Sequence, residues 1–313
     1  MRPAPTGNTK VAGVIGDPVR HSLSPALHNA AFSALGLDWT YLAFEVPSGQ
    51  GADAVAAMRV LGIDGLSVTM PHKDTVAAAV DELSPAAALL GAVNCVRRDG
   101  DRLIGENTDG AGFLRSLRTQ AGVDPAGLHT VVLGAGGAAR AVIVALAAGG
   151  ALVTVVNRSP AAAERAAALG ASAGRATHAE ASRGPGAPER GATATGGAPA
   201  EASRGPSGSA AVGDLGAVRG ADVVVNATPL GMTDGDPLPV DPALLSDGQL
   251  VADLIYRPER TPLLTAAVRA GATTLNGVGM LLYQAAEQFT MWTGYDAPVD
   301  TMAAAVGLDL AGS

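Results

Sequence analysis

Three stretches decide the fold of this chain: the apolar run Thr130-Val-Val-Leu133, the glycine turn Gly134-Ala-Gly-Gly-Ala-Ala-Arg140, and the second apolar run Leu152-Val-Thr-Val-Val156. They predict a strand, a tight turn that opens a helix, and a second strand. Glycines let the backbone approach the phosphates of a dinucleotide, and the free N–H groups and dipole of the helix favour their negative charge. The sequence therefore predicts a nucleotide-binding βαβ unit.

The end of the second strand predicts which dinucleotide binds. An acidic residue about 20 positions after the glycines would accept a hydrogen bond from the 2'-hydroxyl of NAD, whereas an arginine suits the 2'-phosphate of NADP. This strand ends in Asn157, Arg158 and Ser159, with no acid. We therefore expect NADP as the cofactor.

Composition limits the classes of partner. The chain has 313 residues, enough for two domains, and 48% of them are hydrophobic. A net charge of -8 and 3% aromatic residues argue against a nucleic-acid partner. The single cysteine, Cys95, fits a reducing cytoplasm. Neither a secretory signal nor a membrane span is expected, because the first ten residues are polar and no apolar run approaches 18 residues.

The rhythm of apolar runs predicts two α/β domains, the first with a mostly parallel sheet. In the first half we expect strands at 11–15, 41–46, 66–69 and 92–96 and helices at 25–36, 51–61 and 73–90. In the second half we expect strands starting near 130, 152, 222, 250 and 273. A helix at 109–121 would link the domains, and the tail 279–310 would form two helices, split near 295–298, that pack back on the first domain. The predicted domains are thus 1–108 plus 277–313, and 109–276, with a ligand cleft between them.

Residues 171–212 interrupt this rhythm. They are rich in Gly, Ala, Ser and Pro, and the heptapeptide Ala-Glu-Ala-Ser-Arg-Gly-Pro occurs at 179–185 and again at 200–206. Such a segment buries too little apolar surface to offset its ordering entropy. We expect a flexible surface insertion with no role in chemistry.

Four motifs place polar residues where apolar runs end: His21-Ser22-Leu-Ser24-Pro25, Val68-Thr69-Met-Pro71-His72-Lys73, Gly91-Ala-Val-Asn94 and Asn107-Thr108-Asp109-Gly110. Each alone has an ordinary structural explanation, such as a helix cap for Ser24 or Asp109 or a turn for Asn94. Lys73 is less ordinary, because a cation at a helix start opposes the helix dipole. If the strands are parallel, these motifs converge at one sheet edge, where open α/β sheets bind ligands.

Together with further motifs, this chain resembles the shikimate dehydrogenase family over nearly its whole length outside 171–212. The shared motifs are S-x-S-P, P-x-K, G-A-V-N, N-T-D-G, G-A-G-G-A, N-R-S, Asn226-Ala-Thr228, Asp253-Leu-Ile-Tyr256 and Gly277-Val-Gly279-Met-Leu-Leu-Tyr-Gln284. The resemblance implies a substrate domain, a Rossmann-type NADP domain, and reversible NADP-dependent reduction of 3-dehydroshikimate to shikimate in the biosynthesis of chorismate and aromatic amino acids. A monomer or homodimer is expected.

The resemblance also implies roles for residues at the motif positions. Ser22, Ser24 and Tyr256 would hydrogen-bond the substrate carboxylate. Thr69, Asn94, Asp109 and Gln284 would hold the ring hydroxyls, and Lys73 and Asp109 would be the catalytic pair. The cofactor would be held by Gly134, Ala135, Gly136, Gly137, Ala138, Asn157, Arg158, Ser159, Asn226, Ala227, Thr228, Gly277 and Met280. Many relatives carry a second basic residue where this chain has Ala161 and Ala162, so we expect only a moderate preference for NADP over NAD.

Elementary chemistry supports the lysine independently. Hydride delivery to a ketone builds negative charge on oxygen, so the site needs a nearby cationic group that can release a proton. Desolvation in a closing cleft would favour the neutral amine of Lys73, whereas the Asp109 carboxylate would favour the ammonium. We expect Lys73 to donate the proton and Asp109 to orient it.

The motifs also allow two related dehydrogenase activities and a non-catalytic role. A quinate/shikimate dehydrogenase of a catabolic pathway, or an aminoshikimate dehydrogenase of a secondary pathway, would share these motifs. A non-catalytic ligand sensor would have lost the acid or the nucleotide loop, and both are present. No metal is expected, because His21, His28 and His72 lack zinc-like spacing and clustered acids.

Overall fold

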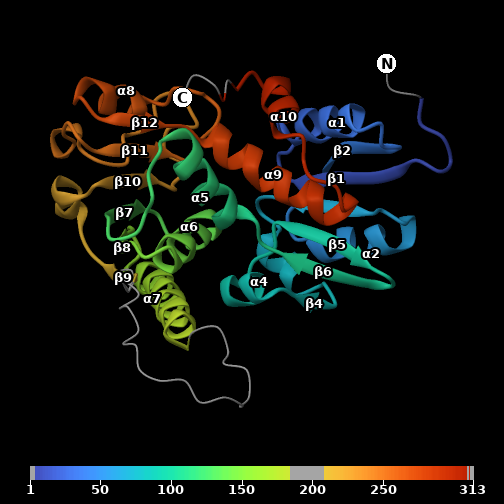
Figure 1. Ribbon diagram of the computed structural model, residues 1–313, viewed down its shortest axis with the longest axis horizontal. Helices are drawn as coiled ribbons and strands as arrows, with labels where there is room; N and C mark the ends of the chain where they lie inside the picture. The colour runs from blue at the N-terminus through green and yellow to red at the C-terminus, as the bar shows by residue number, and fades with distance from the viewer. Residues whose placement is uncertain (1–3, 184–207, 309, 311–313) are drawn as a thin grey trace, which may run out of the picture.

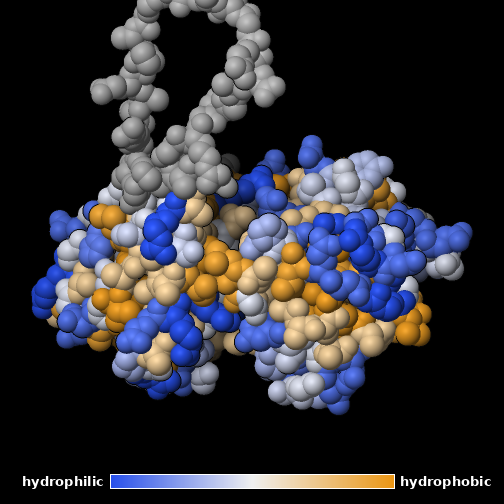
Figure 2. All heavy atoms as spheres, turned by 90° about the horizontal axis from the view of Figure 1, so that it is seen from below, coloured by the Kyte–Doolittle hydropathy of each residue, from blue (hydrophilic) through white to orange (hydrophobic). Residues whose placement is uncertain are grey.

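The computed structural model describes residues 4–183, 208–308 and 310, and in this part of the chain two six-stranded sheets lie beside each other (Figure 1). Figure 2 shows the two lobes side by side, with polar and apolar residues interspersed on the face turned to the viewer. The prediction of two α/β domains is confirmed. Within the described residues, no helix combines the length and apolar character needed to cross a bilayer.

The first sheet has the strand order β2-β1-β3-β5-β6-β4. Its strands are β1 (Lys10–Gly16), β2 (Trp39–Glu45), β3 (Gly65–Val68), β4 (Glu82–Leu83), β5 (Cys95–Asp99) and β6 (Arg102–Glu106). Strands β1, β2 and β3 are parallel, and β5 runs antiparallel to β3 and β6. Because the chain adds β2 on one side of β1 and β3 on the other, the loops after β1 and β3 open at a switch in strand order, where ligands bind in such sheets.

The helices of the first domain correct one prediction. They are α1 (Ser24–Ala34), α2 (Gly51–Leu61), α3 (Lys73–Ala77) and α4 (Pro85–Leu90). A single helix over 73–90 is therefore wrong. The Ser84 side chain accepts a hydrogen bond from the Ala87 amide and starts α4, and a residue before proline disfavours the helical conformation. The sequence pattern also missed β4, which lies within the predicted helix, and β6, and it placed the start of β5 three residues early.

The second sheet is entirely parallel and has the order β12-β11-β10-β7-β8-β9. Its strands are β7 (His129–Leu133), β8 (Leu152–Val156), β9 (Ser209–Val212), β10 (Val223–Asn226), β11 (Leu250–Asp253) and β12 (Thr273–Leu275). Counted within this domain, the order is 3-2-1-4-5-6, which defines the doubly wound Rossmann arrangement. The switch in strand order lies between β7 and β10, so the glycine turn after β7 opens there.

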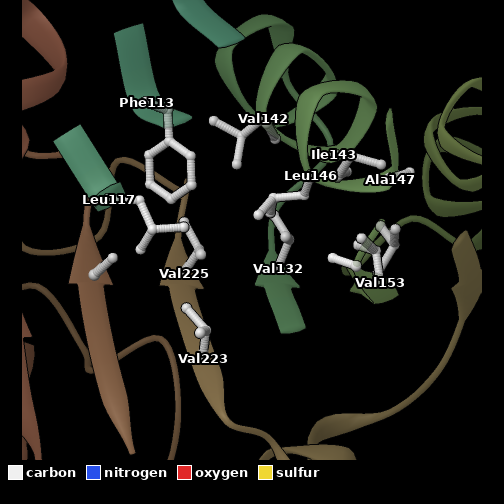
Figure 3. Packing of buried hydrophobic residues seen from close by; sticks show 14 of the residues in the cluster. Phe113, Leu117, Val132, Val142, Ile143, Leu146, Ala147, Val153, Val223 and Val225 are labelled. Atoms are coloured by element: carbon white, nitrogen blue, oxygen red, sulfur yellow. The ribbon is translucent and has the colours of Figure 1, made fainter. Parts of the chain in front are cut away.

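Small apolar side chains fill the core of the second domain. The covering elements are α6 (Gly137–Ala148), α7 (Pro160–Arg183), α8 (Pro262–Arg269) and two short 3-10 turns, Leu215–Gly220 and Pro242–Leu244. Val132 and Val225 of the sheet lie in one buried cluster with Leu146 of α6 (Figure 3). Phe113 and Leu117 of α5 (Asp109–Gln120) belong to the same cluster. The low aromatic content thus gives a core packed mainly from Val, Leu, Ile and Ala.

The segment 171–212, expected to be a flexible insertion, is partly regular. Residues 171–183 continue α7, and 209–212 form β9, which pairs in parallel with β8. Gly174 of α7 lies so close to Gly208 that a Cβ at position 174 would be 2.2 Å from the Gly208 carbonyl oxygen. The composition therefore misled at both ends, because small residues here allow close packing. Residues 184–207 lie outside the described residues.

Helices α5 (Asp109–Gln120) and α9 (Gly277–Thr293) join the domains, and α10 (Val299–Ala305) follows α9 and packs on α1 of the first domain. Helices α5 and α9 run between the two sheets (Figure 1). A Cβ on Gly112 of α5 would be 2.7 Å from the Gln284 backbone nitrogen of α9, so glycine at this position permits the close packing of the two helices. Phe289 and Met302 lie in one buried cluster with Val14 and Leu27 of the first domain. The prediction that the tail forms two helices packed on that domain is confirmed.

His28 gives the first domain an acid-sensitive core. It is fully buried, its ring stacks on Tyr41 at 4.4 Å, and neither ring nitrogen has a hydrogen-bond partner among the residues that the structure describes. Burial lowers the pKa of His28 from 6.5 to about 3. Between these values the unfolded chain binds a proton at this residue and the folded chain does not, so stability is lost as the pH falls below 6.5.

We predict that His28→Phe makes the protein less sensitive to acid. Between pH 6.5 and pH 5 the free energy of unfolding should fall by about 2 kcal/mol more in the wild type than in the variant. Urea unfolding at the two pH values measures this difference. Equal losses in both proteins would show that His28 is protonated in the folded state.

Candidate active site

Backbone hydrogen bonds bring the four polar motifs of the first domain to one sheet edge. The Asp17 amide donates to the Met70 carbonyl at 3.0 Å and thereby joins the loops after β1 and β3. The Val68 backbone N–H donates to the Asn94 backbone carbonyl at 2.8 Å, and the Asn94 backbone N–H donates to the Glu106 backbone carbonyl at 3.0 Å. The antiparallel β5 begins, and β6 ends, at the edge where β1 and β3 end. The convergence expected from the sequence is therefore present.

Lys73 and Asp109 form an ion pair at the centre of this edge. Lys73 is the first residue of α3 and Asp109 the first of α5, and their side chains are 16% and 7% exposed. Asn94 Nδ2 donates to the other carboxylate oxygen of Asp109 at 2.8 Å. Thr108 holds Asn94 in turn, because its backbone N–H donates to Asn94 Oδ1 at 2.8 Å. The ammonium thus has a fixed position and limited contact with water.

Gln284 joins this cluster from the distant C-terminal part of the chain. Its side-chain oxygen accepts a hydrogen bond from Asn94 Nδ2 at 3.1 Å. The close contact of α5 with α9 at Gly112 places the two helices so that Asp109 and Gln284 meet the same asparagine. Four of the sequence-predicted side chains, Lys73, Asn94, Asp109 and Gln284, are therefore in one hydrogen-bonded group.

The two serines at the start of α1 do not act as ordinary helix caps. Leu23 precedes α1, with no side-chain cap, and Ser24 is the first helical residue and is 5% exposed. Ser22 Oγ accepts the Ser24 backbone N–H at 3.2 Å, which leaves the Ser22 hydroxyl proton available to a ligand.

Thr69 and Tyr256 are less closely tied to this group. Thr69 directly follows β3, and its backbone N–H donates to the Ile15 carbonyl at 3.0 Å. Tyr256 follows β11 in the second domain, where burial raises the pKa of its phenol. Neither side chain makes a hydrogen bond within the part of the chain that the structure describes, so both hydroxyls are available to a ligand.

The glycine turn of the second domain is shaped for a ligand backbone. Gly134 has φ +114°, and a Cβ there would be 2.9 Å from the Ala227 carbonyl oxygen. A Cβ on Gly136 would meet nothing within 4 Å, because this position is exposed at the start of α6. Gly134 is therefore needed for the turn itself, whereas Gly136 leaves open space where a pyrophosphate would approach the helix start. These residues fit a dinucleotide.

The glycine turn also meets the ion pair of the other domain. A Cβ on Gly137 would lie 3.8 Å from Cδ of Lys73. Arg140, one turn further along α6, donates to Asp74 of α3 at 3.2 Å. The nucleotide turn and the lysine therefore face each other across the junction of the two domains.

The remaining cofactor candidates fall into two groups. Arg158 is exposed and has no partner among the described residues, whereas Asn157 Nδ2 donates to the Ser159 carbonyl at 3.1 Å. Asn226 is buried at the end of β10, and its Oδ1 accepts the Thr228 backbone N–H at 3.1 Å, with Ala227 against Gly134. Gly277 approaches the Leu254 carbonyl closely, and Met280, Ala135 and Ala138 are buried or half-buried. Met280 belongs to the apolar core of the second domain.

Sequence reasoning overlooked several polar residues beneath the site. Thr108 bonds Asn94, and the buried side chains of Tyr41, Ser67 and Gln288 continue the hydrogen bonds away from Gln284. Two signals were available: Ser67 is polar within a buried strand, and Gln288 lies four residues after Gln284 on the same helix face. Within the described residues, no group of three His, Cys, Asp or Glu side chains could hold a metal ion.

Fold and site together define a two-domain dinucleotide-dependent oxidoreductase with a lysine–aspartate ion pair beside the nucleotide turn. The family model of the shikimate dehydrogenase substrate binding domain matches residues 14–96, and that of the shikimate 5'-dehydrogenase C-terminal domain matches 277–306. The shikimate dehydrogenase (NADP(+)) of Methanopyrus kandleri is 45% identical over 301 residues, which is 95% of each chain.

Solved structures show the same similarity. Shikimate 5-dehydrogenase of Thermus thermophilus, solved with NADP(H) and shikimate, is 33% identical, has a TM-score of 0.77, and is matched over 95% of this chain and 98% of that chain. Quinate dehydrogenase of Corynebacterium glutamicum, solved with NAD, is 28% identical with a TM-score of 0.77 and the same coverage. The chain belongs to the shikimate dehydrogenase family, as its motifs indicated.

We predict that alanine has different effects at two glycines of the turn. Gly136→Ala should leave the melting temperature unchanged but weaken NADP binding roughly tenfold or more, because the methyl group fills the space for the pyrophosphate. Gly134→Ala should lower stability by about 1–3 kcal/mol, because the left-handed conformation disfavours a side chain and its Cβ meets Ala227.

Thermal melting and fluorescence titration with NADP separate the two effects. Unchanged NADP affinity in Gly136→Ala would place the pyrophosphate elsewhere.

Proposed function

We propose that this protein catalyses the reversible reduction of 3-dehydroshikimate to shikimate with NADPH, the step that serves chorismate and aromatic amino-acid biosynthesis. One observation carries the proposal most directly: the buried Lys73–Asp109 pair of the substrate domain lies against Gly137 of the nucleotide turn. A proton donor and a hydride source would therefore meet at one place between the domains.

The lysine supports the reaction in both directions. NADPH, when bound, supplies the hydride that is added to the carbonyl carbon of the substrate. The Lys73 ammonium donates its proton to the carbonyl oxygen, which becomes the hydroxyl. In the reverse direction the neutral amine of Lys73 takes that proton back. Asp109 holds the Lys73 nitrogen in place and stabilises its charged form, and both side chains are largely shielded from water.

Other side chains at the same edge would bind the rest of the substrate. We assign the carboxylate to the hydroxyls of Ser22 and Ser24, with Tyr256 as a further donor from the second domain. Thr69, Asn94 and Gln284, together with Asp109, would bind the ring hydroxyls. The hydroxyls of Ser22, Thr69 and Tyr256 have no acceptor elsewhere among the described residues, which supports this assignment.

We propose that the cofactor is NADP and that it binds at the switch in strand order between β7 and β10 of the second sheet. Gly134, Ala135, Gly136, Gly137 and Ala138 would carry the pyrophosphate. Asn157, Arg158 and Ser159 would surround the 2'-phosphate, for which the exposed Arg158 offers planar, charge-assisted hydrogen bonds. Asn226–Thr228 and the Gly277 to Met280 segment would lie beside the nicotinamide.

Quinate is the second candidate substrate, because the quinate dehydrogenase named above shares the fold. The higher identity to shikimate dehydrogenases and the arginine at position 158 favour shikimate and NADP. Steady-state rates with shikimate, quinate and aminoshikimate, each with NADP and with NAD, decide between these functions. Shikimate with NADP should give the highest kcat/KM, and a higher value with quinate or aminoshikimate would overturn the proposal.

We further propose domain boundaries, an oligomeric state and a cellular compartment for this protein. We place the substrate domain at 1–108 plus 277–313 and the NADP domain at 109–276, which is supported by the two separate sheets and by the tail packed on the first. We expect the protein to be a monomer or a homodimer. We place it in the cytoplasm, because its single cysteine, Cys95, is free and buried, which fits a reducing compartment.

Lys73→Ala tests the assigned acid. The kcat should fall by roughly 10²-fold or more, as expected for loss of a general acid, while the Kd for NADP changes little. The chain offers a matched control in its only other lysine, Lys10, which lies at the start of β1 with a 57% exposed side chain. Lys10→Ala should keep full activity, and near-normal turnover of Lys73→Ala would exclude this lysine from the mechanism.

Arg158→Asp tests the choice of cofactor. The ratio of kcat/KM with NADP to that with NAD should fall roughly 10- to 100-fold, because a charge-assisted pair is replaced by repulsion of the 2'-phosphate. Arg165→Asp changes the charge by the same amount further along α7 and should leave the ratio nearly unchanged. An unaltered ratio in Arg158→Asp would show that this arginine does not contact the 2'-phosphate.

A further inference from the structure

Gln288 lies beneath the site and makes four hydrogen bonds there. It is 1% exposed and lies one turn after Gln284 on α9. Its Nε2 shares two hydrogens among three acceptors: Gln284 Oε1 at 2.8 Å, Thr108 Oγ1 at 3.2 Å and the Asn94 carbonyl at 3.4 Å. Its Oε1 accepts from Ser67 Oγ at 2.5 Å. It thus contacts the residues around the ion pair without touching Lys73 or Asp109.

The chain of hydrogen bonds continues from Gln288 toward the serines. Ser67, 5% exposed in β3, accepts the Tyr41 hydroxyl at 2.6 Å. The Tyr41 ring stacks on the His28 ring at 4.4 Å, and the Ser24 side chain is hydrogen-bonded to the Tyr41 phenol. Because Tyr41 donates to Ser67 and Ser67 donates to Gln288, the Gln288 oxygen faces Ser67 and its amide group faces Gln284.

This direction determines what Gln284 can offer a ligand. A side-chain amide oxygen has two acceptor sites. On Gln284 donors face both sites: Gln288 Nε2 at 2.8 Å, and Asn94 Nδ2 at 3.1 Å, which shares its two hydrogens among Gln284, Asp109 and Thr108. The Gln284 Nε2 group has no partner among the described residues and belongs to a half-buried side chain at the site. Gln284 is therefore left with donors only.

We propose that Gln288 is a positioning residue for substrate recognition: by occupying the carbonyl oxygen of Gln284, it commits Gln284 to donate a hydrogen bond to a hydroxyl oxygen of the polyol substrate. This inference rests on the proposed function and deepens it. Without Gln288 the Gln284 side-chain amide can rotate and turn its oxygen toward the substrate, so the hydrogen bond from Gln284 to the substrate hydroxyl is lost. With Gln288 in place, Gln284 accepts no hydrogen bond from the substrate, so the substrate hydroxyl protons must be accepted by other groups, such as the Asp109 carboxylate.

Gln288→Met removes the amide and keeps the length of the side chain. The KM for shikimate should rise roughly three- to tenfold, as for the loss of one hydrogen bond. The KM for NADP should stay the same and kcat should change less than threefold. Gln249→Met is the matched control, because Gln249 is also buried, at 4% exposure, and donates to two carbonyl groups in the second domain. It should not alter the KM for shikimate.

A double-mutant cycle shows whether Gln288 acts through Gln284. If it does, Gln284→Ala/Gln288→Met should have nearly the same KM for shikimate as Gln284→Ala alone. If the effects of the two single changes multiply, or if Gln249→Met raises the KM equally, Gln288 is only a structural residue and the inference is overturned. Should Gln288→Met fail to fold, the same cycle is run with Ser67→Ala, which frees the Gln288 oxygen, and the same two outcomes decide.

The wild-type control keeps this test separate from the proposed function. A wild-type enzyme that does not turn over shikimate with NADP contradicts the proposed function itself. A wild-type enzyme that is active, combined with multiplying effects in the cycle, contradicts only the role of Gln288.

Discussion

The ion pair between Lys73 and Asp109 constrains the rest of this structure. A lysine at the first position of a helix opposes the helix dipole, and taking its charge out of water is costly without a partner. Asp109 supplies that partner from the start of α5, the helix that leads the chain into the second domain. The position of the Lys73 ammonium and the link between the domains therefore depend on the same residue. Asn94, held by Thr108, fixes the carboxylate in turn.

Close approach of backbones allows the pair to face the nucleotide site. Gly112 permits α9 to pack on α5, and Gly110 does the same for α6, because a Cβ there would be 2.7 Å from the Ala141 carbonyl oxygen. The three helices thus fix the glycine turn at the start of α6 against Lys73. Small residues, abundant in this chain, determine positions at this junction as well as filling the core.

Periodicity and glycine patterns predicted the architecture well. Most of the Rossmann half was foreseen because strands such as β7 and β8 are short and mainly apolar, and β7 runs directly into a glycine turn at Leu133 and Gly134. The missed elements lacked such signals: β6 has a mixed pattern, and β9 lies at the end of a stretch whose composition resembles a linker. Ser84 and Pro85 could have divided the helix predicted at 73–90, because serine followed by proline is typical of a helix start.

Of the site, the sequence predicted the polar side chains that meet at the sheet edge and missed the buried ones that hydrogen-bond to them. Lys73, Asn94 and Asp109 stand where apolar runs end, so their position was visible in one dimension. Tyr41, Ser67 and Gln288 lie within buried elements, and their hydrogen bonds join positions up to 221 residues apart. Such contacts follow from three-dimensional packing alone.

A crystal structure of the ternary complex with NADP and shikimate would test the central claim most directly. The account predicts that Lys73 Nζ lies within hydrogen-bonding distance of the substrate hydroxyl whose carbon faces C4 of the nicotinamide, with Asp109 still bound to the same nitrogen. A complex in which Lys73 points away from that hydroxyl, or in which the nicotinamide lies remote from Gly137, would contradict it.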